Sequence, residues 1–106
     1  MRAGLHKPVE TLDLGGMALA IYNQSQCALP PGTCPRIGIG GHASHGGFGY
    51  TCRLWGVTLD MIVALDVVLA NGSFIHATET TYPDIYYALH GAADSFGIIT
   101  TFHLQT

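Results

Sequence analysis

The segment most able to support chemistry runs from Cys34 to Gly49 and reads CPRIGIGGHASHGGFG. Six of its sixteen residues are glycine, and it also carries one cysteine and two histidines. Glycines at this density allow positive φ angles and let backbone N–H groups approach a large ligand closely. A thiol and imidazoles beside such a loop therefore indicate a site for a bound cofactor.

The type of glycine loop narrows the choice of ligand. The segment does not match the GxxxxGK[ST] pattern of a P-loop, and it does not follow the strand–GxGxxG–helix order of a Rossmann site. Two interpretations remain open. The glycine pairs form tight turns between short strands, or successive amides form an anion-binding concavity suited to a pyrophosphate.

The three cysteines are an odd number, and their spacing fits neither a zinc nor a CxxC redox pattern. Cys27 and Cys52 are expected to be buried structural thiols, which is the common fate of an isolated cysteine. Cys34 stands at the mouth of the glycine loop, where an electropositive and partly open site would favour the thiolate.

The histidines do not predict a metal site. His42 and His45 are three residues apart, but the surrounding glycines argue against a helix that would align them, and no third ligand stands at a diagnostic spacing. His42 is interpreted instead as a hydrogen-bond donor near a ligand. His76, His90 and His103 are expected to be ordinary sheet or helix-end residues.

Composition limits the function classes. The chain has 106 residues, which fits one domain at most, and 10% charged residues with a formal net charge of −3. Its four basic residues are scattered, so neither nucleic acid nor an anionic membrane surface is an expected partner.

No apolar run reaches the roughly 18–20 residues that span a bilayer. Residues 1–10 show no apolar stretch of a signal peptide, and the compartment is left open.

The surrounding pattern predicts an α+β fold in which helices flank an antiparallel sheet. Residues 1–12 are expected to be irregular, and an apolar periodicity beginning at Asp13 predicts a helix. Residues 61–70 predict a strand buried on both faces, with Asp66 at a bulge or paired with Arg53. Further elements are a type I′ hairpin turn at Asn71-Gly72, a return strand over 73–78, a helix beginning at Pro83, and a final strand from Gly97.

Several motifs, in order, resemble the FAD-binding region of the FAD-linked oxidases of the berberine-bridge and oligosaccharide-oxidase type. They are GTCP (32–35), GIGGH (38–42), GGFG (46–49), RLWG (53–56) with Asp60, VVLANG (67–72), PDIYYAL (83–89) and FGIIT (96–100). The resemblance covers the chain from about Leu14 onward. It implies that residues 13–106 are part of an FAD-binding domain of the PCMH type, its second half.

The resemblance also implies a cofactor and its ligands. FAD would be bound by Gly38, Gly40, Gly41, His42, Gly46, Gly47 and Gly49, with Ile98 and Ile99 approaching the flavin through their backbone. Cys34 matches a family cysteine that can form a thioether to the flavin ring. The implied reaction is oxidation of a hydroxyl on a carbohydrate-like substrate by hydride transfer, with dioxygen as acceptor. The catalytic base is expected outside this chain, so no catalytic residue is assigned.

Two other interpretations of the same motifs stay open. The chain is a truncated, non-catalytic remnant that binds flavin weakly or not at all, or it is a structural subunit that completes its site with another polypeptide. Family members are several times longer, and Tyr82 stands where they usually have asparagine before Pro-Asp.

Overall fold

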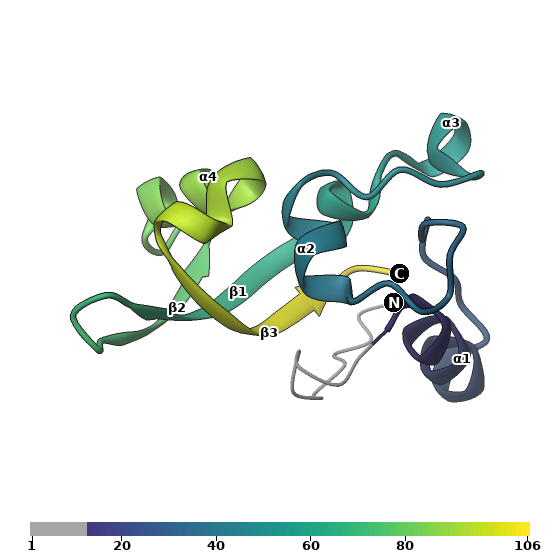
Figure 1. The fold of residues 1–106 in the computed structure, drawn as a ribbon, viewed down its shortest axis with the longest axis horizontal. Coiled ribbons are helices and arrows are strands. Elements are labelled where there is room, and N and C mark those ends of the chain that lie inside the picture. The colour runs from purple at the N-terminus through teal and green to yellow at the C-terminus, as the bar shows by residue number, and fades with distance from the viewer. Residues whose placement is uncertain (1–12) are drawn as a thin grey trace.

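The computed structural model describes residues 13–106, and Figure 1 shows their arrangement. The helices are α1 (Leu14–Ser25), α2 (Ile39–Ser44), α3 (Cys52–Trp55) and α4 (Pro83–Ala92), with short 3₁₀ turns η2 (Thr58–Met61) and η3 (Ala93–Ser95). The strands are β1 (Ile62–Leu69), β2 (Phe74–Thr78) and β3 (Gly97–Leu104). The expected irregular segment 1–12 lies outside the described residues.

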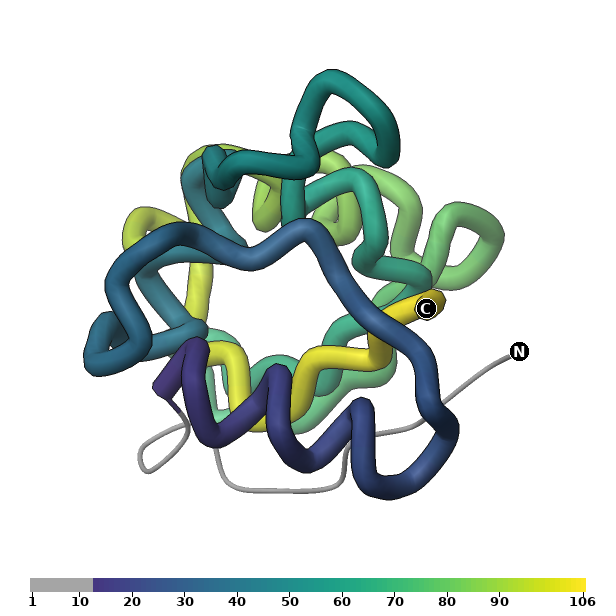
Figure 2. Tube along the Cα trace, turned by 90° about the vertical axis from the view of Figure 1, so that its right-hand side faces the viewer, coloured from purple at the N-terminus to yellow at the C-terminus, as the bar shows by residue number. Residues whose placement is uncertain are grey.

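The three strands form one antiparallel sheet in the order β2-β1-β3, which confirms the α+β prediction. Helices α2 and α4 lie beside each other over one side of this sheet, and α1 lies toward the end opposite the β1–β2 hairpin (Figure 1). The long connection from α1 to α2 arches across the molecule in the view along its long axis (Figure 2). One buried apolar cluster joins all these elements, with Met17, Ile21, Leu65, Val67 and Leu89 fully buried.

Helix α1 begins where the sequence predicts. Asp13 is its N-cap, and the carboxylate accepts a hydrogen bond of 2.7 Å from the Gly16 N–H, which satisfies one of the unpaired donors of the first turn. Leu14, Met17 and Ile21 bury the inner face of the helix against the core. The local cap and the apolar spacing therefore agree with the tertiary packing.

The burial of strand β1 differs from the prediction that both of its faces are buried. The face that carries Leu65 and Val67 is buried, but the opposite face is only half-buried at Asp66 and Val68. Asp66 does not pair with Arg53, but it lies at a register shift between β1 and β3, which agrees with the predicted alternative of a bulge. Its carboxylate contacts His76 on β2 and His103 on β3, because the register of the sheet brings both imidazoles beside it.

The β1–β2 hairpin forms as predicted, but its turn is not type I′. Gly72 has a φ of +83°, whereas Asn71 is not among the described residues with positive φ. The Gly72 N–H donates to the Leu69 carbonyl, and the Leu69 N–H donates to the Ser73 carbonyl. This pattern is that of a three-residue loop in which glycine takes the left-handed position. Asn71 contributes its side chain instead, since its Oδ1 accepts from the Ser73 N–H at 2.9 Å.

Helix α4 begins at Pro83, as predicted, and its backbone leaves helical geometry at His90 and Gly91. The preceding residue, Tyr82, has a left-handed backbone with a φ of 54° and provides no side-chain cap. A fixed proline φ thus starts the helix without help from a capping side chain. Within residues 13–106, no helix has the length and apolar character needed to cross a membrane.

We predict that Gly72→Ala lowers the free energy of unfolding by about 1 kcal/mol, because a side chain at this left-handed position is strained. Urea denaturation of the purified chain measures the change. Gly72→Asn is the matched control, since asparagine tolerates this backbone region better, and its loss should be smaller. Equal stability of the alanine variant and the parent chain would contradict the turn geometry.

Candidate functional site

The centre of the glycine-rich segment is a short helix, α2, which corrects the expectation that its glycines prevent one. Ile39 and Ala43 are four residues apart, and both are buried in the core. Tertiary packing of such an apolar face outweighs the low helix propensity of glycine. Gly38 is the N-cap, and it forms an isolated β-bridge with Asp13 at the start of α1.

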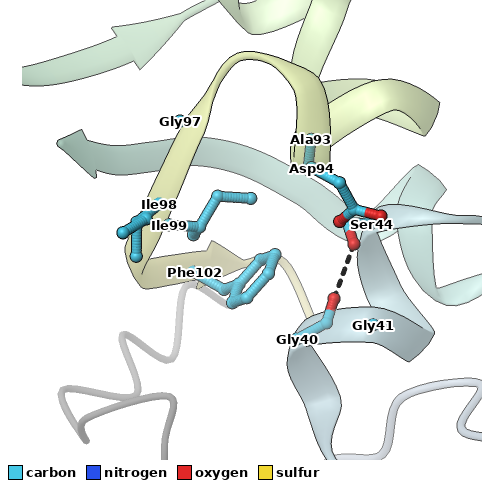
Figure 3. Close-up of a pocket in the computed structure, with 9 residues that line it drawn as sticks. All are labelled: Gly40, Gly41, Ser44, Ala93, Asp94, Gly97, Ile98, Ile99 and Phe102. Carbon is cyan, nitrogen blue, oxygen red and sulfur yellow. Dashed lines mark hydrogen bonds between the residues drawn. The ribbon is translucent and has the colours of Figure 1, made fainter. Parts of the chain in front are cut away.

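A cavity of about 300 Å³ lies between helix α2 and strand β3. The α2 side consists of Gly40, Gly41 and Ser44. Figure 3 shows Ile99 and Phe102 of β3 pointing toward that helix, whereas Ile98 points away from it. Four of the residues predicted to bind a cofactor, Gly40, Gly41, Ile98 and Ile99, therefore line one cavity.

Sequence reasoning missed the remaining residues of this cavity. Ser44, Ala93, Asp94, Gly97 and Phe102 also line it. The Ser44 hydroxyl is turned back to donate to the Gly40 carbonyl at 2.6 Å (Figure 3). The only available signal was that Gly97 belongs to the FGIIT motif and Asp94 stands two residues before it, since the contact with α2 depends on tertiary packing.

The glycines of the 46–49 segment divide into two groups. A Cβ on Gly49 would lie 1.8 Å from the Pro31 carbonyl oxygen, and one on Gly47 would lie 2.6 Å from the Thr58 side chain. These two glycines are therefore required by the packing of the protein itself. In contrast, a Cβ on Gly38, Gly41 or Gly46 would meet nothing within 4 Å.

Thr58 connects the two segments that approach each other at these glycines. Its hydroxyl is buried and donates to the Pro30 carbonyl at 2.6 Å, with the Gly47 carbonyl 3.1 Å away. The Thr58 N–H also donates to the Gly47 carbonyl at 3.2 Å. These contacts hold the loop before Cys34 against the loop after α2.

His42, predicted to be a hydrogen-bond donor near a ligand, uses one ring nitrogen to hold the fold. Its Nε2 accepts a hydrogen bond of 3.0 Å from the Gly32 N–H, so this nitrogen carries no proton. Burial lowers the pKa of His42 below its usual value and favours the neutral ring. The imidazole thus holds the loop that precedes Cys34, and its contact with a ligand stays a prediction.

Cys34 is exposed, as its predicted role requires, and is not among the residues that line the α2–β3 cavity. Its loop is anchored on the first turn of α1, where the Leu14 N–H donates to the Ile37 carbonyl and the Gly15 N–H donates to the Pro35 carbonyl. Cys27 and Cys52 are half-buried. The three thiols thus differ in their accessibility to a reactant.

One buried polar atom beyond the glycine segment has no partner among residues 13–106. It is the hydroxyl oxygen of Thr51, two residues after Gly49. A buried hydroxyl without a hydrogen bond costs free energy, so such a group usually has a partner in the functional protein. The atom is therefore a candidate for contact with a bound group.

Comparison with protein-family models matches residues 16–78, more than half of the chain, to the family described as FAD binding domain. The chain is 46% identical over 93 residues to a xylooligosaccharide oxidase of Thermothelomyces thermophilus, covering 88% of this chain and 19% of that protein. It is 41% identical to a chitooligosaccharide oxidase of Gibberella zeae (88% and 19% covered). It is 37% identical to berberine bridge enzyme-like 12 of Arabidopsis thaliana (87% and 17% covered).

Solved structures show the same relationship. The xylooligosaccharide oxidase of Myceliophthora thermophila, solved with xylobiose, superposes with a TM-score of 0.86 at 45% identity, covering 88% of this chain and 20% of that one. A glucooligosaccharide oxidase of Acremonium strictum, described as carrying 6-S-cysteinyl, 8α-N1-histidyl FAD, superposes with a TM-score of 0.86 at 39% identity (89% and 20% covered). The chain spans about a fifth of the length of these relatives.

The division of the glycines predicts opposite effects of two alanine substitutions on stability. Gly49→Ala should lower the free energy of unfolding by about 2–3 kcal/mol, because its methyl group overlaps the Pro31 carbonyl. Gly41→Ala should leave stability unchanged or raise it by up to about 1 kcal/mol, because alanine favours the helix and has room. Urea denaturation of both variants measures this, and similar losses in the two would contradict the assignment.

The His42–Gly32 hydrogen bond predicts a dependence of stability on pH. Because the folded-state pKa of His42 lies below its unfolded value of 6.5, its contribution is complete above pH 6.5 and is lost as the pH falls through the folded pKa. The melting temperature should therefore fall on acidification from about pH 7.5 to 5.5. His42→Gln, which keeps an acceptor but does not titrate, should show a smaller fall. An identical fall in both proteins would exclude His42 as the source.

Proposed function

The chain belongs to the FAD binding domain family, and we propose that it forms part of the FAD-binding site of an FAD-linked oxidoreductase that oxidises a carbohydrate-like hydroxyl substrate. The family and its matched relatives are FAD-linked oxidases. The observation that carries the assignment to particular residues is the α2–β3 cavity. It brings Gly40 and Gly41 of one motif against Ile98 and Ile99 of another motif far along the chain.

Two observations and one general property of glycine-rich segments support the fit of such a cofactor. Gly38, Gly41 and Gly46 leave open space where any other residue would place a Cβ. Backbone amides of a glycine-rich segment suit the pyrophosphate of a dinucleotide. The buried Thr51 hydroxyl still lacks a partner among the described residues.

We assign the roles as follows. Gly38, Gly40, Gly41 and Gly46 would lie against the cofactor, whereas Gly47, Gly49 and His42 would act mainly by fixing the loops that hold it. Ile98 and Ile99 would approach the flavin through their backbone, which is consistent with the Ile98 side chain pointing away from α2 (Figure 3). Ser44, Asp94 and Phe102 join this set because they line the same cavity.

Cys34 is the residue proposed for a covalent thioether to the flavin. It is the exposed thiol among the described cysteines, and its loop is fixed by α1. The glucooligosaccharide oxidase relative is described as carrying a cysteinyl linkage. The exposed position supplies the access that such a bond needs, and the anchored loop limits its movement.

Bound FAD would supply a hydride acceptor for the carbon that carries the substrate hydroxyl, with dioxygen as the final acceptor. The chain's own contribution is to bind and orient the cofactor. The substrate contacts and the base that removes the hydroxyl proton are assigned to parts of the relatives that lie beyond this chain's match. The xylobiose complex of one relative supports an oligosaccharide as the substrate class.

We predict that the chain expressed with excess FAD is yellow and that the colour stays with the protein after acid precipitation. Cys34→Ser should abolish the acid-stable colour while the far-UV circular dichroism spectrum is unchanged. Cys27→Ser is the matched control and should retain it. Flavin absorbance in the pellet and supernatant measures each case.

The outcomes separate the competing interpretations. Acid-stable flavin in the Cys34→Ser variant would overturn the cysteine assignment but not flavin binding. A folded but colourless parent protein would support the non-catalytic remnant. Colour that appears only on co-expression with a polypeptide carrying the remaining domain would identify a subunit that shares its site.

A further inference from the structure

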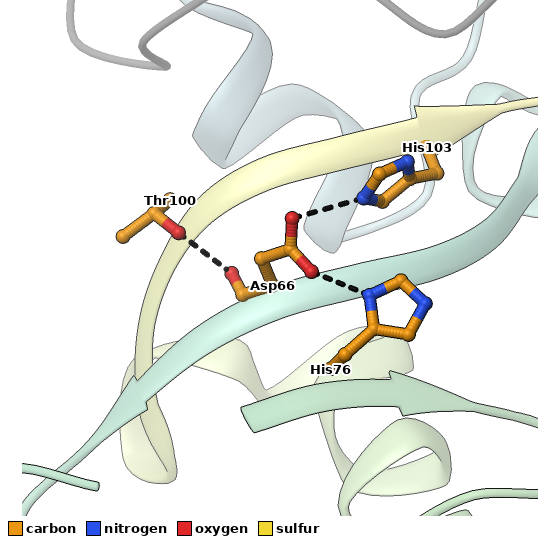
Figure 4. Close-up of polar contacts among 4 residues, drawn as sticks. All are labelled: Asp66, His76, Thr100 and His103. Carbon is orange, nitrogen blue, oxygen red and sulfur yellow. Dashed lines mark hydrogen bonds and ion pairs between the residues drawn. The ribbon is translucent and has the colours of Figure 1, made fainter. Parts of the chain in front are cut away.

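We infer that the sheet carries a divalent transition-metal site, with zinc as the metal that its ligands fit best, formed by Asp66, His76 and His103. The three residues belong to β1, β2 and β3, so each strand contributes one ligand (Figure 4). Their side chains lie on the face of the sheet opposite the one on which Leu65 and Val67 of β1 are buried. The site is separate from the α2–β3 cavity, and the inference does not depend on the proposed flavin binding.

The ligand atoms already converge. One candidate atom from each residue lies within 4.8 Å of the others. The His76 Nδ1 lies 2.5 Å from one carboxylate oxygen of Asp66, and the His103 Nε2 lies 2.9 Å from the other. A cation would take the place of the hydrogen bonds between these pairs, with modest rotations of the side chains.

The chemistry of the set favours zinc. Two imidazole nitrogens and one carboxylate form a common zinc ligand set, with bonds of about 2.0–2.2 Å and a fourth position left for water. Hard cations such as Mg²⁺ and Ca²⁺ prefer sites made of oxygen atoms alone. The two imidazoles therefore select against these ions and in favour of Zn²⁺ and its neighbours in the transition series.

The backbone frame keeps the ligands in place. Asp66 is paired directly with His76 in the β1–β2 ladder, and the Thr100 hydroxyl donates to the Asp66 carbonyl from β3 (Figure 4). Burial acts to raise the pKa of Asp66, but hydrogen bonds and charge from His76 and His103 outweigh it and hold the pKa below its usual value. The carboxylate is thus ionised at neutral pH, as a metal ligand must be.

Solvent can reach the site. The Asp66 and His103 side chains are 17% and 22% exposed, and that of His76 is 53% exposed. A cavity of about 430 Å³ lies beside the two imidazoles and is also lined by Glu79. It provides an entry path, room for water at the fourth position, and a further negative charge at its edge.

Isothermal titration of the EDTA-treated chain with ZnCl₂ at about pH 7.5, where free imidazoles are mostly neutral, tests the inference. We expect one zinc ion per chain. His76→Gln and His103→Gln should each weaken binding by about tenfold or more. His90→Gln is the matched control, because it removes an imidazole outside the cluster, and it should leave the affinity unchanged.

A second measurement on the unsubstituted chain avoids dependence on the folding of the variants. In NMR spectra of the histidine rings, zinc should shift the signals of His76 and His103 and leave that of His90 in place. Binding of equal affinity in all variants, or ring shifts that spare His76 and His103, would place the metal elsewhere and overturn the inference. Absence of zinc binding would overturn it as well, and the cluster would then be a hydrogen-bonded network alone.

Discussion

The buried hydroxyl of Thr58 is the interaction on which the glycine-rich region depends. It joins the carbonyl of Pro30 to that of Gly47, at a place where Gly49 leaves no room for a side chain against Pro31. Loss of the hydroxyl would remove the donor to the buried Pro30 carbonyl, at a cost of about 1–3 kcal/mol for an unpaired buried group, whereas the Gly47 carbonyl would keep the Thr58 N–H as its donor. The Thr58 hydroxyl and the His42–Gly32 hydrogen bond therefore hold the loop before Cys34 against α2 and the segment that follows it.

This contact explains why the glycines of one sequence motif have different roles. Gly47 and Gly49 permit the two loops to meet, whereas Gly38, Gly41 and Gly46 leave open the space that a side chain would fill. His42 helps to hold the loop that Gly49 packs against, because its neutral ring accepts a hydrogen bond from the Gly32 N–H. Tight packing at Gly47 and Gly49 thus occurs in the same motif as open space at Gly38, Gly41 and Gly46, and a binding site for a large cofactor requires such open space.

The elements with strong local signals could be predicted from the sequence, and those set by long-range packing could not. Asp13, Pro83 and the apolar run of β1 fix their elements from neighbouring residues. Helix α2 was missed because burial of Ile39 and Ala43 outweighs its glycines. The Asp66–His103 pair spans 37 residues, and its partner choice depends on a strand register that local sequence does not define.

The same contrast between local signals and long-range packing applies to the candidate site. The motifs led to the correct family, which the family match and the relatives confirm. The sequence could not separate packing glycines from open ones, since the atoms facing each Cβ come from distant segments. Asp94 and Phe102 were missed for the same reason, and the assignment of the individual flavin ligands stays a prediction.

The strand order β2-β1-β3 determines where further strands could be added to this sheet. Within residues 13–106, β1 has a neighbour on each side, whereas β2 and β3 each have a neighbour on one side. An outer strand can pair with a further strand through backbone hydrogen bonds alone, which require no particular side chains from the strand that is added. Growth of this sheet would therefore take place beside β2 or β3 and not beside β1.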